Sequence, residues 1–597
     1  MKKRSIYMAA LLLMLIGASC SDFLDKEYDA SLSETKVFNN PNLTRQFLVN
    51  IYTNLPDGLA PLNDSQFTGA SRDCMTDNAV TYWGLHYYTK IGSDGYTASD
   101  HPLLGFWNNN TTGIRKCNVF LKNARSSVIG NSEKAGDDHK LFDRYRAEAT
   151  LLRAIFHFDL IGWFGATPII EEDQTGTPIV FDLSDPNAMN MERTSAADAL
   201  EWVAAQCDVV KDLLPFRYSN ETSNWGRMSG ATAYALKARA LLYRASLLNN
   251  PANDKTHWSN AFNAAKDFIA KNGQQSNPYL LYNTGNVESD YYTCFTTNPV
   301  YNNEIILARA VWNTNQVERV FLPVGFTGNF SGDGRTNPTQ NFVDCYEMNN
   351  GKRIDEAGSN YNESDPYKNR DPRLAQTIFY QGMTWGRADK EEQRKIDVRY
   401  NSETDKGIDY KSSMGGTYTG YYLKKYVNNI SSKEPATFPH AWILFRYAEI
   451  LLSAAEAINE AEGPTNAYSY VNEVRARAGM PPYEGMSQEE LRKRIQNERR
   501  IELSFEDHRF IDSRRWKLFE GVSASGEVGQ PRYNQLLNLY GVKVTGTSEA
   551  PKYTFELAEA VNSRIFISPK SYYFPIPANE VKRAPKLGQN SGWEVGN

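Results

Sequence analysis

The chain has 597 residues, of which 41% are hydrophobic and 23% charged, proportions of a globular protein that exclude a wholly disordered chain and a bundle of membrane helices. Its net charge is −5, from 65 Lys and Arg against 70 Asp and Glu, so no basic field exists to attract nucleic acid, and no such partner is expected. Aromatic residues make up 12%, including 35 Tyr and 11 Trp. This is more than a helical core needs and indicates that some rings face a ligand.

The first twenty residues have the pattern of an export signal. Lys2, Lys3 and Arg4 precede an apolar run over residues 6–16, and small residues then lead directly into Cys20. The run is too short to span about 30 Å of hydrocarbon. The pattern resembles the lipobox of bacterial lipoproteins, although Gly17 stands where Leu is usual. The resemblance implies that residues 1–19 are a signal peptide and that Cys20 is acylated, for example with palmitate. The alternative is an ordinary secreted protein.

Apolar residues with a period of about 3.6 predict a mainly α-helical protein. The segments are Leu141 to Phe164, Ser195 to Leu214, Gly230 to Leu248, His257 to Lys271, Trp442 to Glu460, Thr465 to Ala478 and Ser487 to Phe505. Alanine recurs on one face of several of them, which lets neighbouring helices approach closely. The pattern predicts a scaffold of helical pairs of the α/α superhelix type, similar to degenerate tetratricopeptide repeats.

Long stretches without a helical period separate these helices, at residues 57–100, 280–440 and 520–597. They are rich in Asn, Gly, Asp and Tyr. Loops of this length commonly carry function when a rigid scaffold holds them. We therefore expect a large, loop-rich portion that binds the ligand.

No motif for catalysis, a metal ion or a cofactor is present. The sequence lacks zinc-protease, P-loop, nucleophile-elbow and dinucleotide fingerprints, and its seven histidines are scattered. The five cysteines after Cys20 are widely spaced, which favours neither a zinc site nor a disulfide framework. Loop carboxylates such as Asp73 and Asp77 leave a calcium ion open, since calcium needs no strict signature in a loop.

A series of motifs runs in order along the chain. It comprises the run R-A-E-A-T-L-L-R-A to W-F-G-A-T-P over Arg146–Pro168, then Pro338–Asp344, Asp371–Leu374, Arg446–Leu452, Val471–Gly479, Glu498–Lys517 and Phe574–Pro577. This series resembles the SusD/RagB family of outer-membrane nutrient-binding lipoproteins, named after the starch-utilization system. The matches cover nearly the whole chain after Cys20.

The resemblance implies a SusD-like organisation. Residues 20–320 would form the N-terminal region with tetratricopeptide-like helices and binding loops, residues 321–597 the C-terminal region, and 20–597 one compact unit. It also implies a non-catalytic lipoprotein, anchored in the outer membrane and facing the cell exterior. Such a protein binds an oligosaccharide and delivers it to a SusC-like TonB-dependent transporter. Some relatives take peptides, so a peptide ligand is the alternative.

The densest motif alternates charged and apolar residues and indicates framework. Its charged members are Arg499, Arg500, Glu502, Glu506, Arg509, Asp512, Arg514 and Arg515. Their density predicts an ion-pair network that holds two helices together. The alternative is a site for an anionic ligand, for which these arginines would have to face an open cleft.

Sugars present apolar faces and a rim of hydroxyls, so a receptor needs flat aromatic rings beside amide, carboxylate or guanidinium groups. Two loop clusters have this composition. The candidate ligand-binding residues are Arg72, Asp77, Asn78, Tyr82 and Trp83 in the first cluster and Trp312, Asn313 and Arg335 in the second. Trp83 and Trp312 are the candidate platforms, and for each the alternative is a place in the core.

Two other classes of function remain open. A glycoside hydrolase would need two carboxylates about 5–9.5 Å apart across a cleft, and loop acids are available. A tetratricopeptide-type protein-interaction scaffold would leave the loop aromatics without a role. We expect a receptor without catalytic residues, metal or cofactor.

Overall fold

The computed structural model describes residues 33–67, 69–82, 87–130, 140–181, 190–327, 331–412, 415–431, 433–558 and 564–594. The predicted signal peptide, Cys20 and Trp83 lie outside these residues.

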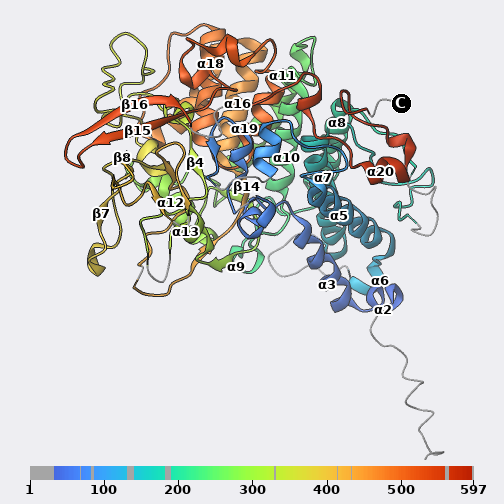
Figure 1. Ribbon diagram of the computed structural model, residues 1–597. Helices are drawn as coiled ribbons and strands as arrows, with labels where there is room; N and C mark the ends of the chain where they lie inside the picture. The colour runs from blue at the N-terminus through green and yellow to red at the C-terminus, as the bar shows by residue number, and fades with distance from the viewer. Residues whose placement is uncertain are drawn as a thin grey trace, which may run out of the picture.

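Helices dominate the described chain, as predicted (Figure 1). In the N-terminal half they are α2 (Glu34–Phe38), α3 (Pro41–Ile51), α4 (Tyr87–Gly92), α5 (Leu104–Asn123), α6 (Ser126–Ile129), α7 (Leu141–Phe164), α8 (Ala196–Val210), α9 (Glu221–Asn224), α10 (Gly230–Ala245) and α11 (Lys255–Gly273). The later helices are α12 (Asp290–Thr296), α13 (Gln316–Phe321), α14 (Gln340–Val343), α15 (Arg373–Thr377), α16 (Tyr447–Glu462), α17 (Tyr468–Arg477), α18 (Gln488–Glu502), α19 (His508–Arg515) and α20 (Ala578–Arg583).

The long helices α7, α8, α10, α11, α17 and α18 confirm the predicted segments within a few residues. Ser487 and Glu490 form a capping box at the start of α18, which satisfies backbone N–H groups that the helix itself leaves free. The predicted helix from Trp442 was wrong in its first turn, because residues 443–446 form strand β14 and α16 begins at Tyr447. Helix α5 was not predicted, since a run of Asn and Thr interrupts its apolar face.

Each long helix packs against the next in a continuous series. Helix α5 contacts α7, α7 contacts α8, α8 contacts α10, α10 contacts α11, and α11 contacts α16, which also contacts α17 and α18 (Figure 1). Ala231, Ala235 and Ala238 of α10 are fully buried, as close helix approach requires. This series gives the mainly helical scaffold, and its likeness to tetratricopeptide repeats stays a prediction.

The strands form short antiparallel pairs that tie distant loops together. The pairs are β1 (Ala79–Val80) with β4 (Asn337–Pro338), β2 (Ile305–Ala308) with β14 (Ile443–Arg446), β3 (Trp312–Thr314) with β13 (Phe438–His440), β5 (Ile378–Phe379) with β12 (Tyr422–Leu423), β6 (Thr384–Trp385) with β7 (Arg394–Lys395), β8 (Tyr400–Ser402) with β9 (Asp405–Lys406), β10 (Lys411–Ser412) with β11 (Gly415–Gly416), and β15 (Tyr540–Gly546) with β16 (Pro551–Leu557). Strands β7, β8, β15 and β16 lie on the side of the molecule opposite α5 and α7 (Figure 1).

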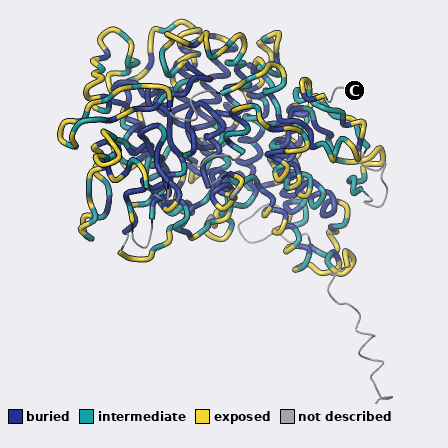
Figure 2. Tube along the Cα trace, in the orientation of Figure 1, coloured by how far each residue is buried: buried dark blue, intermediate teal, exposed yellow. Residues whose placement is uncertain are grey.

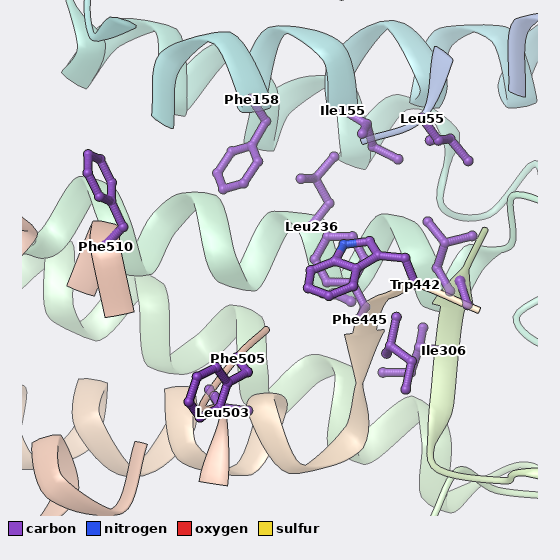
Figure 3. Close-up of a cluster of buried hydrophobic side chains, with 14 of the residues drawn as sticks. Leu55, Ile155, Phe158, Leu236, Ile306, Trp442, Phe445, Leu503, Phe505 and Phe510 are labelled. Carbon is purple, nitrogen blue, oxygen red and sulfur yellow. The ribbon is translucent and has the colours of Figure 1, made fainter. Parts of the chain in front are cut away.

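One hydrophobic cluster, with members from Phe38 to Trp593, includes residues of both the helices and the loops. Buried segments run through the interior of the molecule (Figure 2). Figure 3 shows part of the cluster, with Leu55, Ile306 of β2 and Trp442 beside β14 among its members. Leu55 directly precedes residues 56–67 and 69–82, which we call the first loop. Because the first loop is anchored in this cluster, residues just beyond Leu55 are held in fixed positions on the surface.

The predicted ion-pair network is confirmed between α18 and α19, where Arg499 lies 3.3 Å from Asp512, although Arg514 of the predicted set donates to backbone carbonyls instead. Glu502 accepts hydrogen bonds from Arg446 (2.7 Å) and Arg373 (2.9 Å) and also pairs with Arg477, and all four side chains are buried. Such buried charges are tolerable only because each is paired and hydrogen-bonded. Within the described residues no helix combines the length and the apolar character needed to cross a membrane.

Candidate ligand-binding site

Two adjoining hollows open where the first loop meets the end of β2. We call them the first and second hollow, with volumes of about 470 and 370 Å³, and together the binding groove. Asp57, Ala60 and Arg309 line both hollows and mark the boundary between them. The remaining polar and aromatic lining of the first hollow is Thr53, Asp64, Gln66, Phe67, Arg72, Tyr87, His101, Phe106, Asn109, Asn110 and Asp159, and that of the second is Asn63, Trp312, His440 and Trp442.

An ion pair fixes the boundary of the two hollows. Arg309 Nε lies 3.2 Å from Asp57 Oδ2, and the guanidinium also donates to the carbonyl of Leu55. The backbone N–H of Arg309 donates to the carbonyl of Trp442 at 2.9 Å. The first loop is therefore attached to the β2–β14 pair at the boundary of the two hollows.

The second hollow combines an accessible ring with polar groups. Trp312 is half-buried on β3, where its backbone pairs with His440 of β13. Trp442 is only 6% exposed and forms part of the wall. The exposed amide of Asn63 and the Asp57–Arg309 pair lie in the same lining. A flat ring beside amide, carboxylate and guanidinium groups suits the apolar face and hydroxyl rim of a sugar.

The first hollow has more polar side chains in its lining, and several of them are hydrogen-bonded or ion-paired. The Arg72 guanidinium lies 4.6 Å from the centre of the Phe106 ring and pairs with Asp507. Asp159 accepts hydrogen bonds from Asn110 Nδ2 at 2.7 Å and from the indole N–H of Trp163 at 3.1 Å. Burial raises the pKa of Asp159, because the charged carboxylate loses its hydration there.

Of the residues predicted from sequence, Arg72 and Trp312 line the groove. Asn313 is exposed next to Trp312 on β3. Tyr82 is half-buried against Tyr418, with ring centres 4.6 Å apart. Arg335 is half-buried and pairs with Asp333 at 2.8 Å. Neither Tyr82 nor Arg335 is among the lining residues of the two hollows.

Asp77 and Asn78 are placed in the framework. Asp77 pairs with Arg500 (2.7 Å) and Arg509 (2.8 Å), and Asn78 accepts a hydrogen bond from Arg500 Nε at 2.8 Å. Both are buried. Opposing guanidiniums outweigh burial and hold the pKa of Asp77 below its usual value. These contacts join the first loop to α18 and α19. Asp77 and Asn78 therefore lie outside the groove.

Sequence reasoning missed several residues of the groove, above all Asp57, Arg309, Asn110 and Asp159. Asn110 and Asp159 belong to α5 and α7, and a polar residue on a helix gives no sign that a hollow lies above it. Asp57 and Arg309 come from loops far apart in the chain. In the part of the chain that the structure describes, no group of three or more His, Cys, Asp or Glu side chains is placed to hold a metal ion.

Comparison with known proteins gives consistent matches. A family model described as "SusD family" matches residues 271–593, and one described as "Starch-binding associating with outer membrane" matches residues 22–242. SusD-like protein P2 of Formosa agariphila is 24% identical over 561 residues, 89% of this chain and 95% of the relative. SusD-like protein P25 of the same organism is 24% identical over 531 residues, 84% and 88% of the two chains.

Solved structures share the fold. A SusD-like protein of Bacteroides fragilis has a TM-score of 0.72 at 24% identity, covering 93% of this chain and 98% of its own. A SusD-like carbohydrate-binding protein of the same species has a TM-score of 0.67 at 24% identity, covering 92% and 99%.

Proposed function

Because this chain belongs to the SusD family, we propose that it is a non-catalytic lipoprotein of the cell surface that binds an oligosaccharide. It delivers this cargo to a SusC-like TonB-dependent transporter in the outer membrane. The family assignment supports carbohydrate binding and an association with the outer membrane. The anchor, the transporter and the delivery step are part of the proposal.

The observation that carries the proposal is the second hollow. Trp312 offers a half-buried ring there, with the Asn63 amide and the Asp57–Arg309 ion pair in the same lining. The first hollow continues this lining with further amides, carboxylates and rings. A chain of sugars laid across both would stack one unit on Trp312 and present hydroxyls to the polar groups.

The groove predicts weak binding. A ring that covers about 100 Å² of apolar sugar surface contributes about 2.5 kcal/mol at about 25 cal/mol/Å², and association costs at least about 4 kcal/mol. A few rings and hydroxyl hydrogen bonds therefore give micromolar affinity at most. A receptor that hands its cargo to a transporter needs such weak binding, since a tight complex would delay release.

Affinity electrophoresis and titration calorimetry against a panel of polysaccharides test glycan binding. We expect retardation and micromolar affinity for at least one glycan. The Trp312→Ala protein should bind it at least tenfold more weakly, and Tyr301→Ala, which removes a 74% exposed ring outside the groove, should bind normally. If the wild-type protein bound none of the glycans, the proposal would be contradicted and a peptide ligand would be favoured.

The membrane anchor is tested separately in cells. Metabolic labelling with palmitate should mark the wild-type protein, and Cys20→Ala should abolish the label and release the protein from the membrane fraction. Ser21→Ala, which leaves the cysteine in place, is the matched control. Labelling that persists in Cys20→Ala would refute the anchor.

The partner and the absence of catalysis have their own tests. Affinity purification from gently solubilised membranes should recover a TonB-dependent transporter in a near-equal amount. The purified protein should release no reducing ends from any glycan that it binds. Release that disappears in an Asp57→Asn or Asp159→Asn protein would instead favour a glycoside hydrolase.

A further inference from the structure

Two buried polar atoms in the lining residues of the first hollow have no hydrogen-bond partner among the described residues. They are Nε of Arg72 and Oδ1 of Asn110. An unpaired buried polar atom costs about 1–3 kcal/mol, so native proteins seldom leave one without a reason. Here two occur in residues that face the same hollow.

The chemical character of each atom is fixed by its surroundings. Asn110 Nδ2 donates to the carbonyl of Phe106 at 3.0 Å and to Asp159 Oδ2 at 2.7 Å. Both partners are acceptors, so the amide cannot be turned round, and Oδ1 is an acceptor that needs a donor. Arg72 uses its Nη atoms on Asp507 and on the carbonyl of Asp57. Its Nε–H is a donor that needs an acceptor.

A hydroxyl group meets both needs, because its oxygen accepts one hydrogen bond while its proton donates another. Hydroxyls of one sugar unit in the first hollow could pair with Arg72 Nε and Asn110 Oδ1. A carboxylate or sulfate has acceptors alone and would leave Asn110 Oδ1 unpaired. An ammonium group has donors alone and would leave Arg72 Nε unpaired.

The charges around the first hollow also favour an uncharged ligand. Asp57, Asp64 and Asp159 lie in its lining. Its two cationic side chains already have acidic partners, since Arg72 pairs with Asp507 and Arg309 with Asp57.

The other titratable side chains in the lining supply no positive charge. Burial lowers the pKa of His101, which keeps the imidazole neutral, and the ring already contacts the carbonyl of Pro575 at 2.7 Å. An acidic sugar would therefore face Asp64 and Asp159, which take no part in these two ion pairs, with no cation in the lining left to balance its charge.

We propose that the first hollow is a subsite for an uncharged, hydroxylated sugar unit, bound by Arg72 and Asn110, and that the groove consequently selects neutral over acidic glycans. This inference rests on the proposed function, because it names the class of glycan that the groove takes.

Calorimetry with matched probes tests the selectivity. The neutral panel contains hexasaccharides of β-1,4-mannose, β-1,4-xylose, β-1,4-glucose and α-1,4-glucose together with fully methyl-esterified hexagalacturonate. The acidic panel contains β-1,4-mannuronate, free hexagalacturonate and a chondroitin sulfate hexasaccharide. The mannose and galacturonate pairs differ essentially in charge alone. We expect at least one neutral probe to bind, and every acidic probe to bind at least tenfold more weakly than the best neutral one.

The outcomes separate the two hypotheses. An acidic probe that binds as tightly as the best neutral probe would overturn the selectivity and leave glycan binding intact. If no probe of either panel bound, the proposed function itself would be contradicted, and the selectivity with it.

Two further measurements locate the effect in the first hollow. Asp64 is an exposed residue of the lining. In the Asp64→Lys protein, the ratio of the affinity for neutral probes to that for acidic probes should fall at least threefold. Glu363→Lys, at an exposed site outside the groove, should leave this ratio unchanged. A crystal structure with the tightest neutral probe should place sugar hydroxyls within hydrogen-bond distance of Arg72 Nε and Asn110 Oδ1. A sugar confined to the second hollow, or an unchanged ratio in Asp64→Lys, would overturn the subsite.

Discussion

The backbone of Gly58 lies directly against the indole ring of Trp442. A Cβ atom on Gly58 would stand 2.3 Å from Cζ2 of that ring, closer than any van der Waals contact allows. This contact fixes the distance between the first loop and the β2–β14 pair. Asp57, the neighbour of Gly58, is thereby held opposite Arg309 at the boundary of the two hollows.

We expect Gly58→Ala to lower both stability and ligand binding, because the added methyl must displace either the loop or the indole. Overpacking of this kind costs about 1–3 kcal/mol, measurable by chemical denaturation. The matched control is Gly273→Ala, since a Cβ at Gly273 meets no atom within 4 Å. Equal stability of the two variants would show that the loop moves freely over Trp442.

The two tryptophans of the second hollow should behave differently when they are removed. Trp312 is half-buried at the groove, so Trp312→Ala should weaken glycan binding at least tenfold and leave the melting temperature nearly unchanged. Trp442 is 6% exposed and belongs to the core cluster, so Trp442→Ala should cost about 3–5 kcal/mol. A large loss of stability in Trp312→Ala would place that ring in the core instead.

Glu502 should be essential to the framework. Burial alone would raise its pKa, but the guanidiniums of Arg477, Arg446 and Arg373 outweigh it and hold the pKa well below its usual value of 4.5. A lowered pKa stabilises the fold above pH 4.5, and this stabilisation is lost as the pH falls. Glu502→Gln leaves buried arginines without full compensation, so we expect a loss of about 3–5 kcal/mol at pH 7.

Denaturation curves between pH 4 and pH 8 measure this effect. The difference between wild type and Glu502→Gln should be constant above pH 5 and narrow at lower pH. Glu489→Gln, which alters a side chain that is 69% exposed, should unfold like the wild type. A Glu502→Gln protein of normal stability would contradict the framework role of this glutamate.

Asp73 should show the opposite dependence on pH. Burial raises its pKa from 3.8 to about 6, even though Asn78 and the backbone N–H of Phe505 donate hydrogen bonds to it. The folded state then holds the proton more tightly than the unfolded state. This group therefore destabilises the fold progressively as the pH rises from about 4 to 6, by about 3 kcal/mol in total.

Asp73→Asn removes this cost, because the amide is neutral and its oxygen still accepts hydrogen bonds. We expect the variant to be more stable than wild type at pH 7, and the gain to shrink as the pH falls towards 4. Asp212→Asn, at an exposed site, should change stability little at any pH. A loss of stability in Asp73→Asn at pH 7 would mean that the ionised carboxylate is favoured in the fold.

The sequence by itself determined the helical scaffold and the buried framework. The apolar period of α7 and the capping box of α18 are local properties, fixed by residues within a few turns of one another. The density of charged residues around Glu502 in one short segment indicates framework, whereas the arginines that pair with Glu502 come from other segments.

Only the tertiary structure decided which polar loop residues form the groove. Asp57 and Asp77 are both loop aspartates twenty residues apart, yet Asp57 lines the groove and Asp77 is buried against Arg500 and Arg509. The difference lies in their partners, which come from segments more than two hundred residues away in the chain. Burial and charge pairing arise from such distant contacts, and no local pattern encodes them.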